Sequence, residues 1–170
     1  HLRTDNPNFD SAADDMNYTE FYIKPGAIVD YRFNPDLNVF AGGSFVAART
    51  QGDGDPGYYT EGGDGRTDID ELYLGIESGH WTLTAGRQNY LVGNGFIVMD
   101  GDLDQDDDGA YWTAPRTAFK ASAVLAYRDD QFSAQLFSLG TDQDIGDYRL
   151  TGINADVPMA GGKIGAMITR

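Results

Sequence analysis

The sequence contains no cysteine and no long apolar run, and cationic residues are few. The absence of cysteine excludes a disulfide-stapled scaffold and any thiolate metal site. Because no apolar stretch reaches about 18 residues, the sequence predicts no membrane-spanning helix. Twelve Lys and Arg stand against 27 Asp and Glu, which gives a formal net charge of -15. This balance argues against nucleic acid as a partner, since phosphate binding needs clustered cations.

Histidine is also scarce, and this bears on catalysis. His1 and His80 are the only two histidines, so a nucleophile–base triad has few candidate bases. His80 stands between two alternating segments and is more simply a turn residue. Glycine-rich stretches lack the Lys-Ser/Thr that follows a phosphate loop. We therefore expect a protein that is not an enzyme.

What the sequence does have is glycine and aromatic residues in short alternating runs. It contains 22 Gly, 10 Tyr and 9 Phe among 170 residues. Side chains that alternate between apolar and polar with period two indicate β-strands with two different faces. About eight such segments occur, in pairs: 18–33 with 37–50, 69–78 with 81–88, 117–127 with 131–139, and 148–155 with 163–169. The composition and this pattern predict an all-β chain.

The connections between these segments alternate in length. Short turns at Asn34–Asp36, Ser78–His80 and Arg128–Asp130 join the strands within pairs, while long acidic loops cover 51–68 and 89–116. Outer-membrane barrels have short turns at one end and long loops at the other. We therefore predict an antiparallel up-and-down transmembrane β-barrel over 18–170, preceded by a polar segment at 1–17. The apolar strand faces carry almost no charge, as a lipid-facing surface requires, although a soluble half-buried sheet shows the same alternation.

Aromatic residues gather beside the short turns. Six of them are expected at that end of the hairpins: Tyr31, Phe33, Phe40, Trp81, Tyr127 and Phe132. Rings at headgroup level form a girdle around membrane barrels. The alternative interpretation is the ordinary preference of aromatic residues for strands.

The acidic segment at 100–109 is the most chemically loaded stretch. Asp104, Asp106 and Asp108 followed by Gly109 match the first half of an EF-hand loop, and Asp102 lies just before them. The expected bidentate Glu is absent, and Pro115 stands near its place. We expect either a surface Ca²⁺ site formed by Asp102, Asp104, Asp106 and Asp108 or a solvated acidic loop. No cofactor is required.

Charged residues also occur on the polar strand faces, where they would line a lumen. The expected set is Glu20, Lys24, Asp30, Arg32, Glu71, Glu77, Lys120 and, if a bulge at Gly86 reverses the alternation, Arg87. Rings of fixed charge set the selectivity of a pore. Because the signs are mixed, internal salt bridges that stiffen the wall are an equally good interpretation.

Several short segments resemble one family of proteins. They are Glu71–Ile76, Leu83–Gln88, Gly93–Phe96, Asp30–Phe33, Asp36–Val39 and Ala114–Phe119. Together they resemble the N-terminal portion of the alginate export (alginate-porin-like) outer-membrane β-barrel family. The resemblance implies a larger barrel with a cation-lined pore for an anionic polysaccharide. It points to Arg87 and Arg116 as pore-lining residues, whereas the acidic loops depart from such a pore.

The leading hypothesis is a porin-like channel in the outer membrane of a Gram-negative bacterium, for passive passage of small solutes or anionic polysaccharide. One alternative is a non-conducting eight-stranded barrel that acts as an anchor or adhesin, since about eight strands fill their own interior. Another is a soluble Ca²⁺-dependent carbohydrate-binding β-sandwich. The expected partner is outer-membrane lipid. Because the chain starts at His1 and ends without an aromatic residue, we expect a removed targeting segment and a piece of a larger barrel, whose unpaired edges favour self-association.

Overall fold

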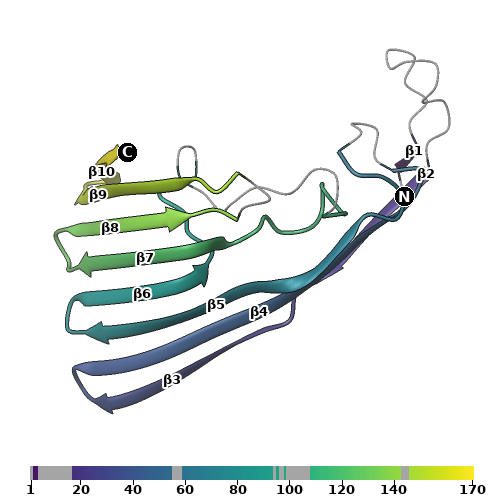
Figure 1. Cartoon of the computed structure of the whole chain (residues 1–170). Coiled ribbons are helices and arrows are strands. Elements are labelled where there is room, and N and C mark those ends of the chain that lie inside the picture. Colours follow the sequence, from purple (N-terminus) through teal and green to yellow (C-terminus); the bar gives the residue numbers. More distant parts are fainter. Residues whose placement is uncertain are drawn as a thin grey trace. The chain divides into compact units, whose positions relative to one another are not determined.

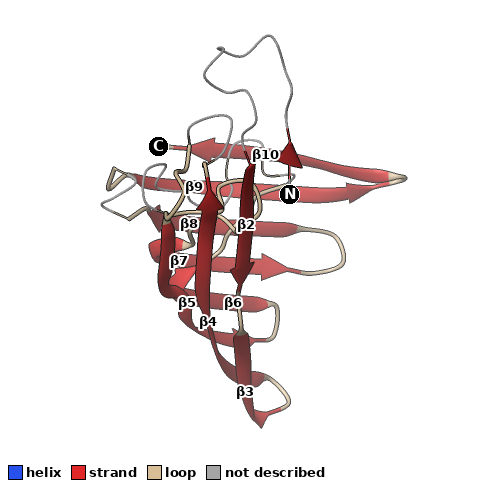
Figure 2. Cartoon of the chain, turned by 90° about the vertical axis from the view of Figure 1, so that its right-hand side faces the viewer, coloured by secondary structure: helices blue, strands red, loops and turns tan. Residues whose placement is uncertain are grey.

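The computed structural model describes residues 2–3, 17–54, 59–93, 95, 98, 108–142 and 146–170. All regular elements of these residues are β-strands (Figure 2). No helix in the described part is long and apolar enough to cross a membrane. Ten strands occur: β1 Leu2–Arg3, β2 Asn17–Ile23, β3 Gly26–Asn34, β4 Leu37–Gly52, β5 Gly65–Ser78, β6 Trp81–Gln88, β7 Phe119–Arg128, β8 Ser133–Gly140, β9 Arg149–Met159 and β10 Gly162–Thr169.

The strands form one antiparallel meander. The order is β1-β2-β4-β5-β6-β7-β8-β9-β10, and β3 pairs with β4 beside this path (Figure 1). Short turns at 35–36, 79–80 and 129–132 join the strands of three hairpins, as the alternation predicts, and another at 160–161 joins β9 to β10. The antiparallel all-β prediction is confirmed. The sheet is not closed into a barrel, because within the described residues β10 pairs only with β9.

Residue contacts divide the chain into two compact units. The first contains His1–Pro25, Phe45–Ile69 and Asp102–Arg116, and the second contains Gly26–Ser44, Asp70–Gly101 and Thr117–Arg170. The second unit holds β3, β6–β10, residues 37–44 of β4 and residues 70–78 of β5. Each unit is described by itself below.

Two strand predictions need correction. The segment 18–33 is not one strand but two, β2 and β3, separated at Lys24 and Pro25. Proline has no N–H to donate to a ladder, so it interrupts pairing. Both pieces pair with β4 in one constant register, Tyr18 with Gly52 and Gly26 with Ser44. The long loop at 51–68 is also shorter than expected, because β4 continues to Gly52 and β5 begins at Gly65.

The register separates two faces in the second unit. Paired residues of neighbouring antiparallel strands lie on the same face. The pairs Leu83 with Leu125 and Leu136 with Ile153 therefore share one face, which we call the apolar face. Val124 with Phe137, and Gln135 with Asn154, share the opposite face, which we call the inner face.

On the inner face, β4 and β5 fit by placing rings over glycines. A Cβ added to Gly42 would lie 2.3 Å from the Tyr73 ring, and one added to Gly75 would lie 2.1 Å from the Phe40 ring. The two rings meet edge to face at 6.4 Å. Phe40 is thus the exception among the six aromatic residues expected beside the turns, because it lies on the inner face.

Gly42→Ala should therefore destabilise the protein by about 1–3 kcal/mol, since the methyl group has no space beside Tyr73. Gly43→Ala is the matched control, because its added Cβ meets nothing closer than 3.5 Å. The measurement is the urea midpoint of each folded variant. Equal midpoints for the two variants would contradict this account of how β4 and β5 fit.

The turn between β7 and β8 depends on one carboxylate. Asp129 accepts hydrogen bonds from the backbone N–H of Gln131 and Phe132, both at 2.8 Å, and from the Tyr127 hydroxyl at 2.8 Å. The backbone bond from Gln131 is the largest of the causes that lower the pKa of Asp129 from 3.8. The charged carboxylate is thus the form that the turn stabilises.

Asp129→Asn should accordingly lower stability at neutral pH. A depressed folded-state pKa contributes stability above the unfolded value, and this contribution is lost as the pH falls through the folded value. The difference in unfolding free energy between wild type and Asp129→Asn should therefore shrink as the pH falls below about 3.8 and vanish below the folded-state pKa. Urea midpoints from pH 7 to pH 2 measure this, with Asp130→Asn as the control. A difference that does not change with pH would argue against a charge-dependent turn.

Candidate functional site: a two-faced sheet

The apolar face of the second unit is exposed and carries no charged residue over a broad band. Leu74 is 66% exposed, Leu136 51% and Ile168 74%. On this face the uncharged residues extend on β7 from Ala121 to Tyr127 and on β9 from Thr151 to Val157, with Asp156 on the opposite face. At a rise of about 3.4 Å per residue these runs span about 20 Å. Such a contiguous apolar surface is unusual for a protein in water.

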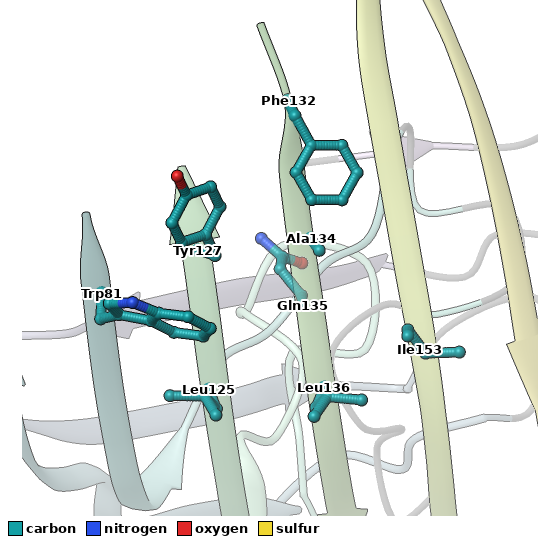
Figure 3. Close-up of a pocket in the computed structure, with 8 residues that line it drawn as sticks. All are labelled: Trp81, Leu125, Tyr127, Phe132, Ala134, Gln135, Leu136 and Ile153. Carbon is teal, nitrogen blue, oxygen red and sulfur yellow. The ribbon is translucent and has the colours of Figure 1, made fainter. Parts of the chain in front are cut away.

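Aromatic rings gather at the turn end of this face. The rings of Trp81 and Tyr127 lie 4.9 Å apart, and that of Phe132 lies 6.2 Å from Tyr127. With Leu125, Leu136 and Ile153 they surround an apolar hollow of about 350 Å³ (Figure 3). Tyr31 and Phe33 form another edge-to-face pair, at 4.7 Å. The concentration of rings beside the short turns is thus as expected from the sequence.

The inner face of the second unit has different side chains on β3–β5 and on β7–β9. On β3–β5 it is polar: Asp30 lies opposite Phe40, and Arg32 lies opposite Asn38. The Ser44 hydroxyl donates to Glu71 at 2.9 Å, and the Asn38 amide donates to Glu77 at 3.2 Å. Four expected lumen residues therefore share one face: Asp30, Arg32, Glu71 and Glu77.

On β7–β9 the inner face carries a covered apolar cluster beside the polar pair Gln135 and Asn154. Val98, Phe119, Val124, Phe137 and Leu139 form a buried cluster, against which Tyr90 and Val92 pack. The Tyr90 hydroxyl donates to Gln135 at 2.6 Å, and burial raises the pKa of Tyr90 to about 12, so the donor stays protonated. Tyr90, Val92 and Val98, which follow β6, thus pack on the inner face. Sequence analysis placed them in a loop, although their apolar side chains were a usable signal.

Arg87 and Lys120 lie elsewhere than expected. Arg87 pairs with Leu72 and so lies on the side of the apolar face. Between Gly86 and Gln88 the register shifts, and two β7 residues, Lys120 and Ala121, stand opposite Arg87. Asp142 binds both cations, Arg87 at 3.1 Å and Lys120 at 2.8 Å. The expected inner-face position of these two residues is therefore corrected. Lys120 changes sides because the bulge adds a residue to β7, whereas Arg87 keeps its regular pairing with β5 and so stays on the apolar-face side.

The first unit holds the remaining expected residues. Glu20 on β2 lies opposite Thr50 and accepts the Trp112 backbone N–H at 3.2 Å. Lys24 lies in the break between β2 and β3. Arg116 stands 5.3 Å from the centre of the Tyr111 ring, which stacks on Tyr59 at 4.4 Å. This aromatic cluster was missed by sequence reasoning, because 59 and 111 are far apart in the chain.

Of the four expected Ca²⁺ ligands only Asp108 is described. Its carboxylate lies 3.4 Å from the Arg66 guanidinium, which also donates to the Pro115 carbonyl at 2.6 Å. Asp102, Asp104 and Asp106 lie outside the described residues. Within the part of the chain that is described, no group of three or more His, Asp or Glu is placed to hold a metal ion. The Ca²⁺ site therefore stays a prediction.

Comparison with known proteins gave no family model, no curated protein and no solved structure that matches this chain. The likeness to alginate export proteins thus stays a prediction from short sequence segments. The candidate site is defined by geometry: one exposed apolar face with a broad charge-free band, and one face with polar and covered parts.

Two leucines on β8 test this division of faces. Leu139→Ala should destabilise the detergent-folded protein by about 2–5 kcal/mol, because Leu139 is 1% exposed in the inner cluster. Leu136→Ala should cost far less, since Leu136 is 51% exposed on the apolar face and its truncation leaves no internal cavity. Urea midpoints measure both changes. A larger loss for Leu136→Ala would reverse the assignment of the faces.

Proposed function

We propose that this chain forms part of the wall of a β-barrel channel in a Gram-negative outer membrane. The observation that carries the proposal is the exposed, charge-free apolar face, which extends about 20 Å along the strands. Transmembrane barrels present an apolar band about 25 Å tall, bordered by aromatic rings. Trp81, Tyr127 and Phe132 are in the right place for one such border.

Lipid suits this face better than water does. A soluble sandwich would need a second sheet over Leu74, Leu83 and Leu136, and all described strands belong to a single sheet. In water, such a surface drives association. In a bilayer, the same side chains contact hydrocarbon, and backbone groups pair within the sheet.

The inner face would then line the lumen, and its charges favour small solutes over an anionic polysaccharide. On β3–β5 three carboxylates, Asp30, Glu71 and Glu77, accompany one cation, Arg32. Of the two cations to which the family resemblance points, Arg87 lies on the apolar-face side, as does Lys120, and Arg116 lies against the Tyr111 ring in the first unit. The proposed channel therefore prefers small cations and neutral solutes.

A second candidate is a barrel without an open pore. The specific observation in its favour is the covered inner face of β7–β9, where Val98 and Leu139 are each 1% exposed. A segment folded inward narrows a lumen, and in a small barrel it can fill it. Conductance separates the two candidates.

The full chain, folded into detergent and added to planar bilayers, should give stepwise conductance that favours K⁺ over Cl⁻. Glu71→Gln with Glu77→Gln should lower the K⁺/Cl⁻ permeability ratio by about two-fold or more, because fixed carboxylates attract cations. Asp130→Asn, in a short turn, is the control and should leave the ratio close to that of wild type. Heat-modifiable migration on a gel checks folding.

Two results would count against the channel. Heat-modifiable protein that inserts and does not conduct supports the closed barrel instead. A monodisperse monomer that is soluble without detergent contradicts both membrane candidates.

A further inference from the structure

Three cations lie in one row beyond the charge-free band, at the end of the sheet away from the short turns. Arg87 on β6 pairs with Leu72, Lys120 stands at the bulge of β7, and Arg149 on β9 pairs with Gly140. The chain has only 12 Lys and Arg in 170 residues. Three of these within four consecutive strands of the sheet, on β6, β7 and β9, are therefore a local concentration of positive charge in a strongly acidic protein.

Two of these cations, Lys120 and Arg149, border a hollow on the apolar-face side. The hollow has a volume of about 350 Å³ and is also lined by Ala121, Ala123 and Ser138. The Arg149 guanidinium donates to the Ser138 hydroxyl at 3.3 Å. The Lys120 ammonium is 49% exposed although it contacts Asp142. The alanines leave the space between the two cations open.

The charges of this hollow suit an anion. The two charged residues that line it, Lys120 and Arg149, are both cations; Lys120 contacts Asp142 at its border, and Arg149 contacts the neutral Ser138 hydroxyl. Guanidinium and ammonium groups bind phosphate oxygens through charge-assisted hydrogen bonds. The adjoining apolar band places acyl chains directly beside the hollow, which a free anion would not need.

We propose that the hollow between Lys120 and Arg149 binds the phosphate group of an anionic lipid, in the leaflet that faces the long loops. This inference rests on the proposed membrane function and adds a specific lipid contact to it. The acyl chains of that lipid cover Leu83, Leu125 and Leu136, while Arg149 and Lys120 hold its phosphate. Basic groups between membrane-embedded segments bind headgroups in this way.

The test uses the full chain in phosphatidylcholine vesicles that contain spin-labelled phosphatidic acid or spin-labelled phosphatidylcholine. The motionally restricted fraction of each label gives the selectivity for the phosphate monoester. Wild type should prefer phosphatidic acid. Lys120→Ala and Arg149→Ala should each lower this preference, by up to about five-fold per cation removed.

Arg128→Ala is the matched control. Arg128 is also an exposed cation of β7, but it pairs with Ser133 on the inner face at the short-turn end. Its removal should leave the lipid preference unchanged. Heat-modifiable migration should be the same for all variants, which separates lost binding from lost folding.

The failures are distinguishable. If wild type inserts and shows no preference for phosphatidic acid, the lipid site is wrong and the channel proposal stands. If inorganic phosphate abolishes the preference, the hollow is a site for free phosphate and the lipid proposal is overturned. If the chain inserts into neither vesicle, the membrane function is wrong, and the lipid site with it.

Discussion

The backbone register of the antiparallel sheet is the constraint on which the other features depend. A slip of one residue would move every side chain of a strand to the opposite face. In the second unit this register keeps Leu83, Leu125 and Leu136 on one face and Val124 and Phe137 on the other. Rings placed over glycines stabilise the same alignment between β4 and β5, since neither Gly42 nor Gly75 has space for a side chain. Surface chemistry thus follows from pairing.

Much of this fold could be predicted from local sequence. Period-two alternation and turn residues placed β6 at Trp81–Gln88, as observed, and located the turns at 35–36 and 79–80. The interruption at Lys24 and Pro25 was missed because the apolar alternation continues through it, and the register with β4 does so too. Phe40 was grouped with the rings beside the turns without regard to its face, although the alternation with Val39 and Ala41 indicates the inner face that it occupies.

The candidate site was harder to predict, because its residues depend on contacts between distant segments. Asp30, Arg32, Glu71 and Glu77 share the inner face, as simple alternation suggests. Lys120 departs from this alternation, since a bulge adds one residue to β7 and shifts which positions share a face. Sequence analysis did not single out Arg149, because it comes near Lys120 only through the pairing of β9 with β8 and of β8 with β7. Tyr90, Val92 and Val98 lack strand periodicity, yet they cover the inner face.

That inward covering bears directly on what the opposite face contacts. On β7–β9 the inner face carries a buried apolar cluster beside Gln135 and Asn154, and the opposite face is apolar. The apolar cluster of the inner face is covered within the chain, by Tyr90, Val92 and Val98. The opposite face carries Leu136 and Ile153, 51% and 42% exposed. A sheet with water on its second face would place polar residues there. The cations beyond this band sharpen the argument, since Arg149 and Lys120 mark where the apolar surface ends and where a headgroup, rather than a second protein core, would begin.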